Sequence, residues 1–586
     1  MSKNNNTLLL FKNFSKLSSD NYYLSVVPVS NEIKNKFKIK EIDFVLPQKN
    51  EILENYNYCD RIYKKLLKKI LKLFNEIHNV NFNEREIEII IGYWLKNYIY
   101  LSFKIFKQLE FVFEKEQIDN VLTTEHTSFN FVKENTLEFA GAHALDLKWY
   151  YCFFSKIIDY FNNDFSKNTI IEKIGDDEKP RKILRQKTKL TDKFLYFVQG
   201  KLKNSNNAFI SHTYLSFLEE KKLELLFHQL PNYYKSLDIK NDIPINFDLR
   251  KKYSTIARND EINFENFLLT NIFNFLPKSF LENFKENIKL SETDFFPKNP
   301  KFLFTSSLNF FDEIFKVYAA LQLKNNKPIF IGQHGNNYFS RIHNNYLPEF
   351  NYATKFLSWG YESSNFKNVT GLFNFKTAKK NFTNKIQSKK KLVIFLEYLN
   401  NVSDNLFYSP GEISKSLSRI EMFLKGIRKE IKNNVILRMN NSFYEKTYGL
   451  SYFNYFNNLE VEVDNGQKSQ NKILREAKLC IFNYDSTGFL ENSCNNLPSI
   501  MFFGKEYLNF INDDFIRKYK DLNKENIIFY DDLLLSNHIN QIWDNVEGWW
   551  NSRQVQNSLK KFNHKLNDKG NNKSLSLIMS TIKKNL

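Results

Sequence analysis

The chain has 586 residues and a net charge of +19, with 42% hydrophobic residues and only 16 Gly and 12 Pro. This composition is typical of a folded globular protein and excludes disordered, collagen-like and turn-dense all-β architectures. The four cysteines form no CxxC pair, which argues against a disulfide scaffold and a zinc finger. No apolar run approaches the roughly 18 residues that cross a bilayer, and the N-terminus does not resemble a secretory signal. We therefore expect a soluble cytoplasmic protein.

The positive charge has two interpretations. A basic surface attracts nucleic acid, anionic lipid or phosphorylated substrates. Alternatively the charge is compositional, because the chain is rich in Lys, Asn, Ile, Phe and Tyr, as an AT-rich genome would produce. The basic residues are scattered, so the charge alone favours the compositional explanation.

The first half of the chain is mostly helical by its pattern. Apolar residues recur at helical spacing over 61–74, and residues 81–95 turn strongly apolar, which indicates a buried helix. A short strand is expected at 120–124 and an aromatic-rich helix at 145–162. Charged residues at 175–192 predict a loop, and residues 210–290 read as mainly helical with breaks at prolines.

The pattern changes near residue 300. An apolar strand at 301–305 is followed by an amphipathic helix over 312–324 and a second strand at 328–331. This βαβ order predicts a parallel sheet with a right-handed crossover. The polar, lysine-rich stretch 376–391 has no periodicity, so we interpret it as a linker.

A second α/β unit follows the linker. The continuous apolar run 392–396 is typical of a strand buried on both faces. Further strands are expected at 435–438, 459–463, 479–482 and 498–503, alternating with helices, which is the pattern of a doubly wound domain. Residues 540–586 return to helix. The fold class is therefore α/β.

The most informative segment surrounds His334, where a buried strand runs directly into Gly332-Gln333-His334-Gly335. Ligands of open parallel sheets bind beyond the carboxyl ends of the strands. A neutral imidazole there can act as a general base or donate a hydrogen bond to a phosphate or sugar oxygen. The alternative is a histidine that merely finishes the strand, and the local sequence supports the two about equally.

A second segment joins a strand to a helix at Asp485-Ser486-Thr487. Unpaired backbone N–H groups and the helix dipole attract an anion at such a position, so the two hydroxyls can bind a diphosphate. Plain N-capping of the helix is the stronger alternative from local sequence. Glu491, about one turn further on, could accept hydrogen bonds from ribose hydroxyls or be an ordinary first-turn acid.

Other polar residues stand at predicted strand ends. Arg438 could clamp a phosphate or pair with a core carboxylate. Glu397 is a candidate for the same cleft, and Asp464 ends another strand, although a solvated strand end is the simpler interpretation of both acids. The sequence holds no dinucleotide fingerprint, P-loop or Asp-x-Asp metal pair, and no recognisable RNA-binding motif.

Taken together, these segments resemble a bacterial family of transferases that are encoded in surface-polysaccharide and O-antigen loci. The resemblance covers residues from about 70 to 505. It rests on the order of the following motifs: Leu73 to His78, Arg85, Gly92 to Leu95, Gln333-His334-Gly335, Leu357-Ser358-Trp359-Gly360, Asp485-Ser486-Thr487, Glu491 and Leu497-Pro498.

That family is more remotely similar to capsule Kdo transferases and to the polyglycerol-phosphate transferases of teichoic acid synthesis. The resemblance implies a GT-B-like fold, in which two Rossmann-like domains face a central cleft and the C-terminal domain holds the donor nucleotide. It implies a metal-independent reaction with no cofactor, in which Ser486, Thr487 and Arg438 bind the donor phosphates and Glu491 binds the ribose. The candidate catalytic residues are His334 and Glu397, and the candidate donor-binding residues are Gln333, Gly335, Asn336, Arg438, Asp485, Ser486, Thr487 and Glu491.

The expected domains are an N-terminal, helix-rich acceptor domain (1–375), a linker (376–391), a nucleotide-donor domain (392–540) and C-terminal helices (541–586). The function we predict is transfer of a sugar from a nucleotide donor to a glycan or lipid-linked acceptor, with contact to the inner membrane as an option and no nucleic-acid partner. The alternatives are a nucleotide-sugar epimerase, a glycerophosphotransferase and a non-catalytic polyanion-binding protein.

Overall fold

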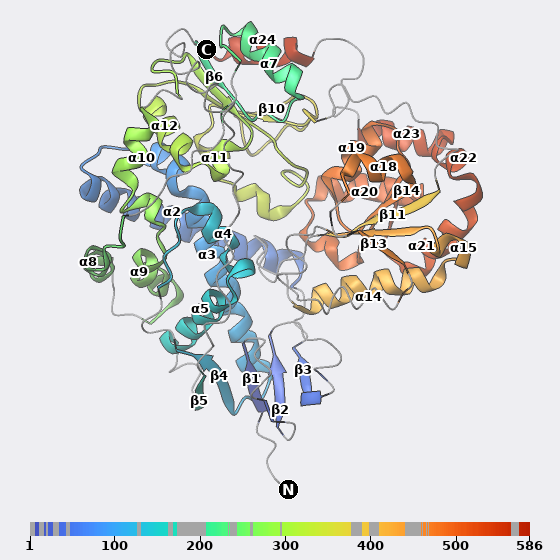
Figure 1. The fold of residues 1–586 in the computed structure, drawn as a ribbon, viewed down its shortest axis with the longest axis horizontal. Helices are drawn as coiled ribbons and strands as arrows, with labels where there is room; N and C mark the ends of the chain where they lie inside the picture. Colours follow the sequence, from blue (N-terminus) through green and yellow to red (C-terminus); the bar gives the residue numbers. More distant parts are fainter. Residues whose placement is uncertain are drawn as a thin grey trace.

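The architecture is seen in a computed structural model of the chain (Figure 1). The predicted charged loop at 175–192 and most of the predicted linker lie outside the residues that the structure describes. Those residues are 6–10, 17–18, 21–26, 34, 36–42, 47–125, 130–161, 168–172, 207–231, 234, 243–257, 262–292, 296–376, 390–397, 410–439, 459, 461–464, 466, 468–563 and 574–586.

The described strands form three sheets, and every strand pair in them is parallel. The prediction of an α/β fold with Rossmann-like sheets is confirmed. We call the three sheets N-terminal, middle and C-terminal, after their order in the chain. In Figure 1 the N-terminal sheet lies apart from the other two, at the end of the long helices that follow it.

The C-terminal sheet has the strand order β13-β12-β11-β14-β15-β16, which is the 3-2-1-4-5-6 order of a Rossmann fold. Strand β13 starts three residues later than the prediction, and β16 was not predicted. The strands are β11 (Lys391–Phe395), β12 (Val435–Arg438), β13 (Glu462–Asp464), β14 (Ala477–Phe482), β15 (Ser499–Phe502) and β16 (Ile528–Phe529).

Side chains of the central strand β11 alternate between two cores, as the two-residue period of a strand requires. Leu392 and Ile394 enter the core beneath α14 and α21, whereas Val393 enters the core on the opposite face. The helices of this region are α14 (Pro410–Gly426), α15 (Lys429–Lys432), α18 (Gln470–Glu476), α19 (Thr487–Cys494), α20 (Asp513–Lys524), α21 (Asp532–Ile542), α22 (Val546–Trp550), α23 (Arg553–Phe562) and α24 (Ser574–Lys584), with the short 3-10 turns η5 (Lys505–Phe510) and η6 (Trp543–Asn545).

The middle sheet has its strands in consecutive order, and it contains the predicted βαβ unit as β7-α12-β8. Asp312 caps α12 by accepting a hydrogen bond from the Phe315 amide. The strands are β6 (Ala208–Ile210), β7 (Phe302–Thr305), β8 (Ile329–Gly332), β9 (Lys355–Ser358) and β10 (Val369–Gly371). The helices around it are α7 (Phe217–Leu226), α8 (Phe247–Ala257), α9 (Phe264–Phe275), α10 (Phe284–Ser291), α11 (Leu308–Phe311), α12 (Glu313–Lys324) and α13 (Glu349–Tyr352), with η2 (Lys278–Phe280) and η3 (Ile342–Tyr346).

The N-terminal sheet is the main element that the sequence pattern did not reveal. Only β4 matches a predicted strand, and the other strands have three to five residues each. Two long helices follow the first three strands, and a capping box at Asn83 begins the second of them. The elements are β1 (Asn6–Leu9), β2 (Tyr22–Ser25), β3 (Ile39–Glu41), α2 (Lys49–His78), α3 (Glu84–Lys115), β4 (Asn120–Thr124), α4 (Thr136–Leu145), α5 (Leu147–Tyr160) and β5 (Asn168–Glu172).

Two features join the middle and C-terminal regions. One apolar core contains side chains from both sheets, including Phe304 and Phe330 of the middle sheet and Phe482 of the C-terminal sheet. In addition, the final helix α24 contacts α7, so the end of the chain returns to the middle sheet (Figure 1). The predicted boundary at residue 540 falls inside α21, and the run of C-terminal helices begins at Asp532.

Candidate functional site

His334 follows β8, the third strand of the middle sheet in chain order. The strand ends on Gly332 because a side chain there would collide with the Ser306 hydroxyl and the Phe375 ring. The Gln333 side chain then fixes the turn: its Nε2 donates to the Gly335 carbonyl at 2.7 Å, and its Oε1 accepts from the Trp359 amide at 2.8 Å. Gln333 is 1% exposed. The structure therefore gives this predicted donor-binding residue a role in shaping the turn and in joining two of the sequence motifs.

The His334 imidazole is half-buried and held by protein groups. Its Nδ1 lies 2.7 Å from the Tyr338 hydroxyl, and the ring also hydrogen-bonds to the Ser306 carbonyl. Burial and, to a smaller extent, the positive charge of Lys376 lower the pKa of His334 to about 4. The ring is therefore neutral at physiological pH, which is the form that general-base catalysis requires.

A buried chain of hydrogen bonds extends behind His334. The Tyr338 hydroxyl that contacts the imidazole also donates to Glu349 Oε1 at 2.9 Å, and the Tyr93 hydroxyl donates to the other carboxylate oxygen. Glu349 has no exposed surface, and burial raises the pKa of its carboxyl group. The N-terminal motif that contains Tyr93 thus reaches the imidazole through two side chains.

The loop that contains His334, residues 333–346 (the His334 loop), lies directly against the C-terminal sheet. The Asn336 amide donates to Thr487 Oγ1 at 2.9 Å, and Asn336 Nδ2 donates to the Asp485 carbonyl at 2.8 Å. A Cβ atom at Gly335 would lie 3.7 Å from Thr487 Oγ1. The structure therefore brings together the two segments that the sequence singled out, although 151 residues separate Asn336 from Thr487.

The start of α19 uses its polar groups within the protein. Ser486 is the N-cap of the helix, and its hydroxyl accepts from the Gly488 amide at 2.9 Å. Ser486 is 2% exposed, whereas Thr487 and Glu491 are half-buried. The N-capping interpretation of this segment is confirmed for Ser486, and Glu491 borders a cleft.

Asp485 has a role that the sequence did not indicate. Its carboxylate is completely buried and accepts hydrogen bonds from Arg341 Nε at 2.9 Å, Arg341 Nη2 at 2.7 Å, Ser340 Oγ at 2.7 Å and the Tyr507 hydroxyl at 2.5 Å. Arg341 and Ser340 belong to the His334 loop, so this ion pair joins the middle and C-terminal sheets. The expectation that the Asp485 side chain binds donor is corrected: its carboxylate holds the interface and has no surface to offer a ligand.

The remaining candidates are also paired. Glu397, at the end of β11, accepts from Arg341 Nη2 at 3.0 Å and so belongs to the same interface network. Arg438, at the end of β12, forms an ion pair with Asp464 at the end of β13 and donates to the Lys468 carbonyl at 2.8 Å. Of the two interpretations left open for Arg438, the structure contains the pairing with a carboxylate.

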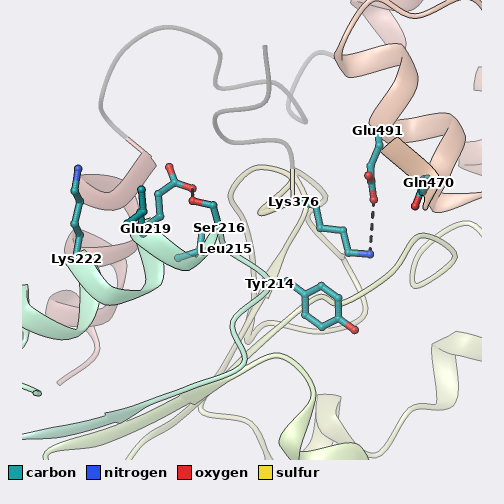
Figure 2. A pocket seen from close by; sticks show the side chains of 9 residues that line it. Tyr214, Leu215, Ser216, Glu219, Lys222, Lys376, Gln470 and Glu491 are labelled. Atoms are coloured by element: carbon teal, nitrogen blue, oxygen red, sulfur yellow. Dashed lines mark hydrogen bonds and ion pairs between the residues drawn. The ribbon is translucent and has the colours of Figure 1, made fainter. Parts of the chain in front are cut away.

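A cleft of about 610 Å³ lies between the two sheets, next to these segments (Figure 2). Glu491 of α19 borders it from the C-terminal sheet, and Lys376 lies opposite, with its Nζ 3.7 Å from Glu491 Oε1. The same ammonium lies 4.8 Å from the centre of the Tyr214 ring, which in turn stacks 6.0 Å from the His334 imidazole. The lining residues are Tyr214, Leu215, Ser216, Leu218, Glu219, Lys222, Lys376, Gln470 and Glu491.

Sequence reasoning missed Tyr214 and Lys376. Tyr214 follows β6 and, like His212 beside it, has a positive φ, of 66° and 55° respectively. Non-glycine residues adopt this conformation rarely, and such residues gather at binding sites. No sequence signal marks them, because Tyr214 belongs to no motif and Lys376 lies in the predicted linker.

Two kinds of feature are absent from the described residues. Within these ranges no group of three or more His, Cys, Asp and Glu side chains is arranged to hold a metal ion. None of the helices given above combines the length and the apolar character that a bilayer crossing demands.

The fold and the site define a class. Two parallel sheets, of which the C-terminal one has the Rossmann strand order, share a cleft and have the candidate residues at the carboxyl ends of their strands, which makes this an α/β fold. The chain belongs to the LIC12162 family of transferases, whose model matches residues 29–582. It is therefore a transferase. No curated protein sequence matches it.

Similar solved structures are glycosyltransferases and a polymerase. MurG of Acinetobacter baumannii is 15% identical, with 48% of this chain and 73% of that chain covered and a TM-score of 0.25. The wall teichoic acid polymerase TagF is 13% identical, with 49% and 72% covered and a TM-score of 0.30. The spinosyn rhamnosyltransferase SpnG is 9% identical, with 57% and 81% covered and a TM-score of 0.31.

Proposed function

We propose that this transferase moves a sugar from a nucleotide donor to a glycan or lipid-linked acceptor in bacterial surface-polysaccharide assembly, on the cytoplasmic side of the membrane. The observation that supports this most is the cleft, which has Glu491 of α19 on one wall and, on the other, Tyr214, whose ring stacks on the His334 imidazole. An electrophilic donor and a nucleophilic acceptor would have to meet between these two groups.

The donor would lie along α19. The Glu491 carboxylate can accept hydrogen bonds from ribose hydroxyls, and the Lys376 ammonium beside it can neutralise a phosphate. The exposed part of the Tyr214 ring offers an apolar face for a base or a sugar. Arg438 could reach a phosphate only by leaving Asp464, so we assign it a smaller part than the sequence suggested.

His334 would act on the acceptor. In the transfer step the bond between the sugar's anomeric carbon and the donor phosphate oxygen breaks, and a bond from that carbon to the acceptor oxygen forms. The acceptor hydroxyl proton passes to the neutral imidazole, and the nucleotide leaves with the bonding electrons. Because the Tyr338 hydroxyl gives its proton to Glu349, Nδ1 of His334 donates to the Tyr338 oxygen, and the lone pair that would take the acceptor proton is on Nε2.

Tyr338 would be a positioning residue in this mechanism, because it holds Nδ1 of His334 and is itself held by Glu349. Replacing Tyr338 by Phe removes only the hydroxyl. We expect a fall in kcat with an unchanged KM for the donor, together with a shift in the pH profile, because the imidazole loses a hydrogen-bond partner. A purely structural role would lower the melting temperature without moving the pH profile.

The first experiment tests donor binding without knowledge of the sugar. Thermal-shift measurements with CMP-, UDP-, GDP- and dTDP-compounds identify the nucleotide, since a ligand that binds the native state raises stability. Glu491→Gln should weaken this stabilisation. Asp521→Asn, which alters an exposed acid on α20 outside the cleft, is the matched control and should bind like the wild type. Absence of stabilisation by every nucleotide would refute the proposal.

The second experiment measures release of the nucleotide from the sugar donor that binds. His334→Ala should keep the nucleotide-induced stabilisation and lose turnover by a factor of about 10² to 10⁴, the usual contribution of a general base. Full turnover in this variant would remove His334 from the mechanism. An altered sugar nucleotide formed without acceptor would identify an epimerase instead, and steeply salt-dependent binding of nucleic acid without nucleotide binding would identify a polyanion-binding protein.

A further inference from the structure

Helix α7 buries its acidic side chains and exposes most of its large apolar ones, the reverse of an ordinary surface helix. Its acids point inward: Glu219 and Glu224 are 2% and 0% exposed. Leu223 is buried, but the other four large apolar side chains point outward, with Phe217 60%, Leu218 69%, Leu225 56% and Leu226 47% exposed. A helix on the surface of a water-soluble protein has the opposite arrangement. Burying a carboxylate costs free energy, and exposing a large apolar side chain to water does not stabilise the fold.

The buried acids of α7 have partners that explain their placement. The Ser216 hydroxyl donates to Glu219 at 2.8 Å, and the Lys221 ammonium donates to Glu224 at 2.8 Å. Glu220, which is half-buried, accepts from both the amide and the hydroxyl of Thr213. The carboxylates of α7 are therefore paired with groups of the protein, and none of them lies on the exposed face of the helix.

The neighbouring helix α24 extends the same surface (Figure 1). The charged side chains of α24 are Lys583 and Lys584, both exposed, and the helix has no acid. Five of the fourteen large apolar side chains that are exposed in the described parts of the chain lie on these two helices (Phe217, Leu218, Leu225, Leu226 and Leu577), and two more, Leu230 and Leu586, follow within four residues of the helix ends. We call the surface that they form the α7/α24 surface.

This surface adjoins the cleft. Leu218 and Lys222 belong both to α7 and to the cleft lining, and Figure 2 shows Lys222 and Glu219 on the helix beside the pocket. Whatever covers the α7/α24 surface therefore lies at the edge of the cleft.

We propose that the α7/α24 surface docks on an anionic lipid bilayer. Exposed Phe and Leu side chains enter the headgroup–acyl boundary, and the surrounding lysines face the negative headgroups, which is the combination that holds amphipathic helices at membrane interfaces. The absence of exposed acids on both helices favours an anionic membrane over a protein of mixed charge. The inference deepens the proposed function, because it places the cleft where a lipid-linked acceptor emerges.

The test is co-sedimentation of the full chain with vesicles, without nucleotide or acceptor. The protein should bind vesicles that contain phosphatidylglycerol, bind phosphatidylcholine vesicles less, and lose binding as salt is raised. The triple variant Phe217→Ser, Leu225→Ser, Leu226→Ser should lower the affinity at least about tenfold, since three apolar side chains no longer enter the interface. None of these three residues lines the cleft.

The matched control changes exposed leucines elsewhere. Leu533 and Leu534 of α21 are 63% and 62% exposed, comparable with those of α7. Leu533→Ser, Leu534→Ser should leave vesicle binding at the wild-type level. A second variant, Lys583→Glu, Lys584→Glu, should weaken binding to the anionic vesicles alone. Melting temperatures and nucleotide-induced shifts must match the wild type in each variant.

Three results would overturn the inference: no binding of the wild type to anionic vesicles, equal losses in the α7 and α21 variants, or conversion of a dimer to a monomer by the α7 substitutions with vesicle binding unchanged. The last would identify a contact between protein chains. Failure of vesicle binding leaves nucleotide binding and transfer untouched, so this inference and the proposed function fail separately.

Discussion

Replacing Asp485 by Ala should loosen the contact between the middle and C-terminal sheets. Its fully buried carboxylate receives two hydrogen bonds from Arg341, which is 6% exposed, together with those from Ser340 and Tyr507. Removing one member of a buried ion pair costs about 3–5 kcal/mol, because the other charge stays buried without compensation. Glu397 still contacts Arg341 at 3.0 Å, so we expect the lower end, about 3 kcal/mol.

Hydrogen exchange measures this quantity at the interface itself. The Asn336 amide donates to Thr487, and the Asn512 amide donates to the Ser340 carbonyl at 2.8 Å, so both amides exchange only when the interface opens. A loss of about 3 kcal/mol corresponds to roughly 100-fold faster exchange at both amides.

An exposed ion pair provides the control. Lys49 of α2 pairs with Asp513 of α20 at 2.6 Å, and the Asp513 side chain is 83% exposed. Exposed pairs contribute about 0–1 kcal/mol, so Asp513→Ala should speed exchange by less than about fivefold. Similar exchange rates in the two variants would refute the view that burial of Asp485 is what fastens the interface.

Two further predictions concern the surroundings of His334. Gly332→Ala should destabilise the protein by about 1–3 kcal/mol, because the added Cβ would collide with neighbouring side chains. The control Gly335→Ala has room for a Cβ and should melt within a degree or two of the wild type. Equal melting temperatures of the two variants would contradict this packing argument. Lys376→Ala removes a positive charge that disfavours the imidazolium form, so the pKa of His334 should rise from about 4. The acid limb of kcat/KM should then move to higher pH, and an unmoved limb would mean that His334 titration does not limit activity.

Much of the fold could be predicted because continuous apolar runs and helical spacing are local properties. The buried runs at 392–396, 435–438 and 479–482 correspond to β11, β12 and β14, and the βαβ unit after residue 300 was recognised for the same reason. Most of the N-terminal sheet could not be predicted, because its strands are too short to show the alternation of apolar and polar side chains that marks a strand. Such strands are stabilised by their neighbours, and sequence pattern does not carry that information.

The sequence predicted several residues of the candidate site but not which of them contact one another. Strand-end rules placed His334 and Thr487 correctly, each beyond the carboxyl end of a parallel strand. The same rules assigned Asp485 to a ligand, although it neighbours Thr487 in the chain. A strand-end acid has the same sequence signature whether it faces a ligand or a buried arginine.

The amino-acid sequence by itself determined which segments are strands and helices, and where glycine, imidazole and hydroxyl groups stand along them, because backbone conformation and periodic burial depend on near neighbours. Only the tertiary structure decided that Arg341 lies against Asp485, that Tyr214 and Lys376 border the cleft, and that α7 exposes three of its four leucines. These outcomes depend on packing between residues far apart in the chain, where shape and the need to compensate buried charge select one arrangement among many that the local pattern allows.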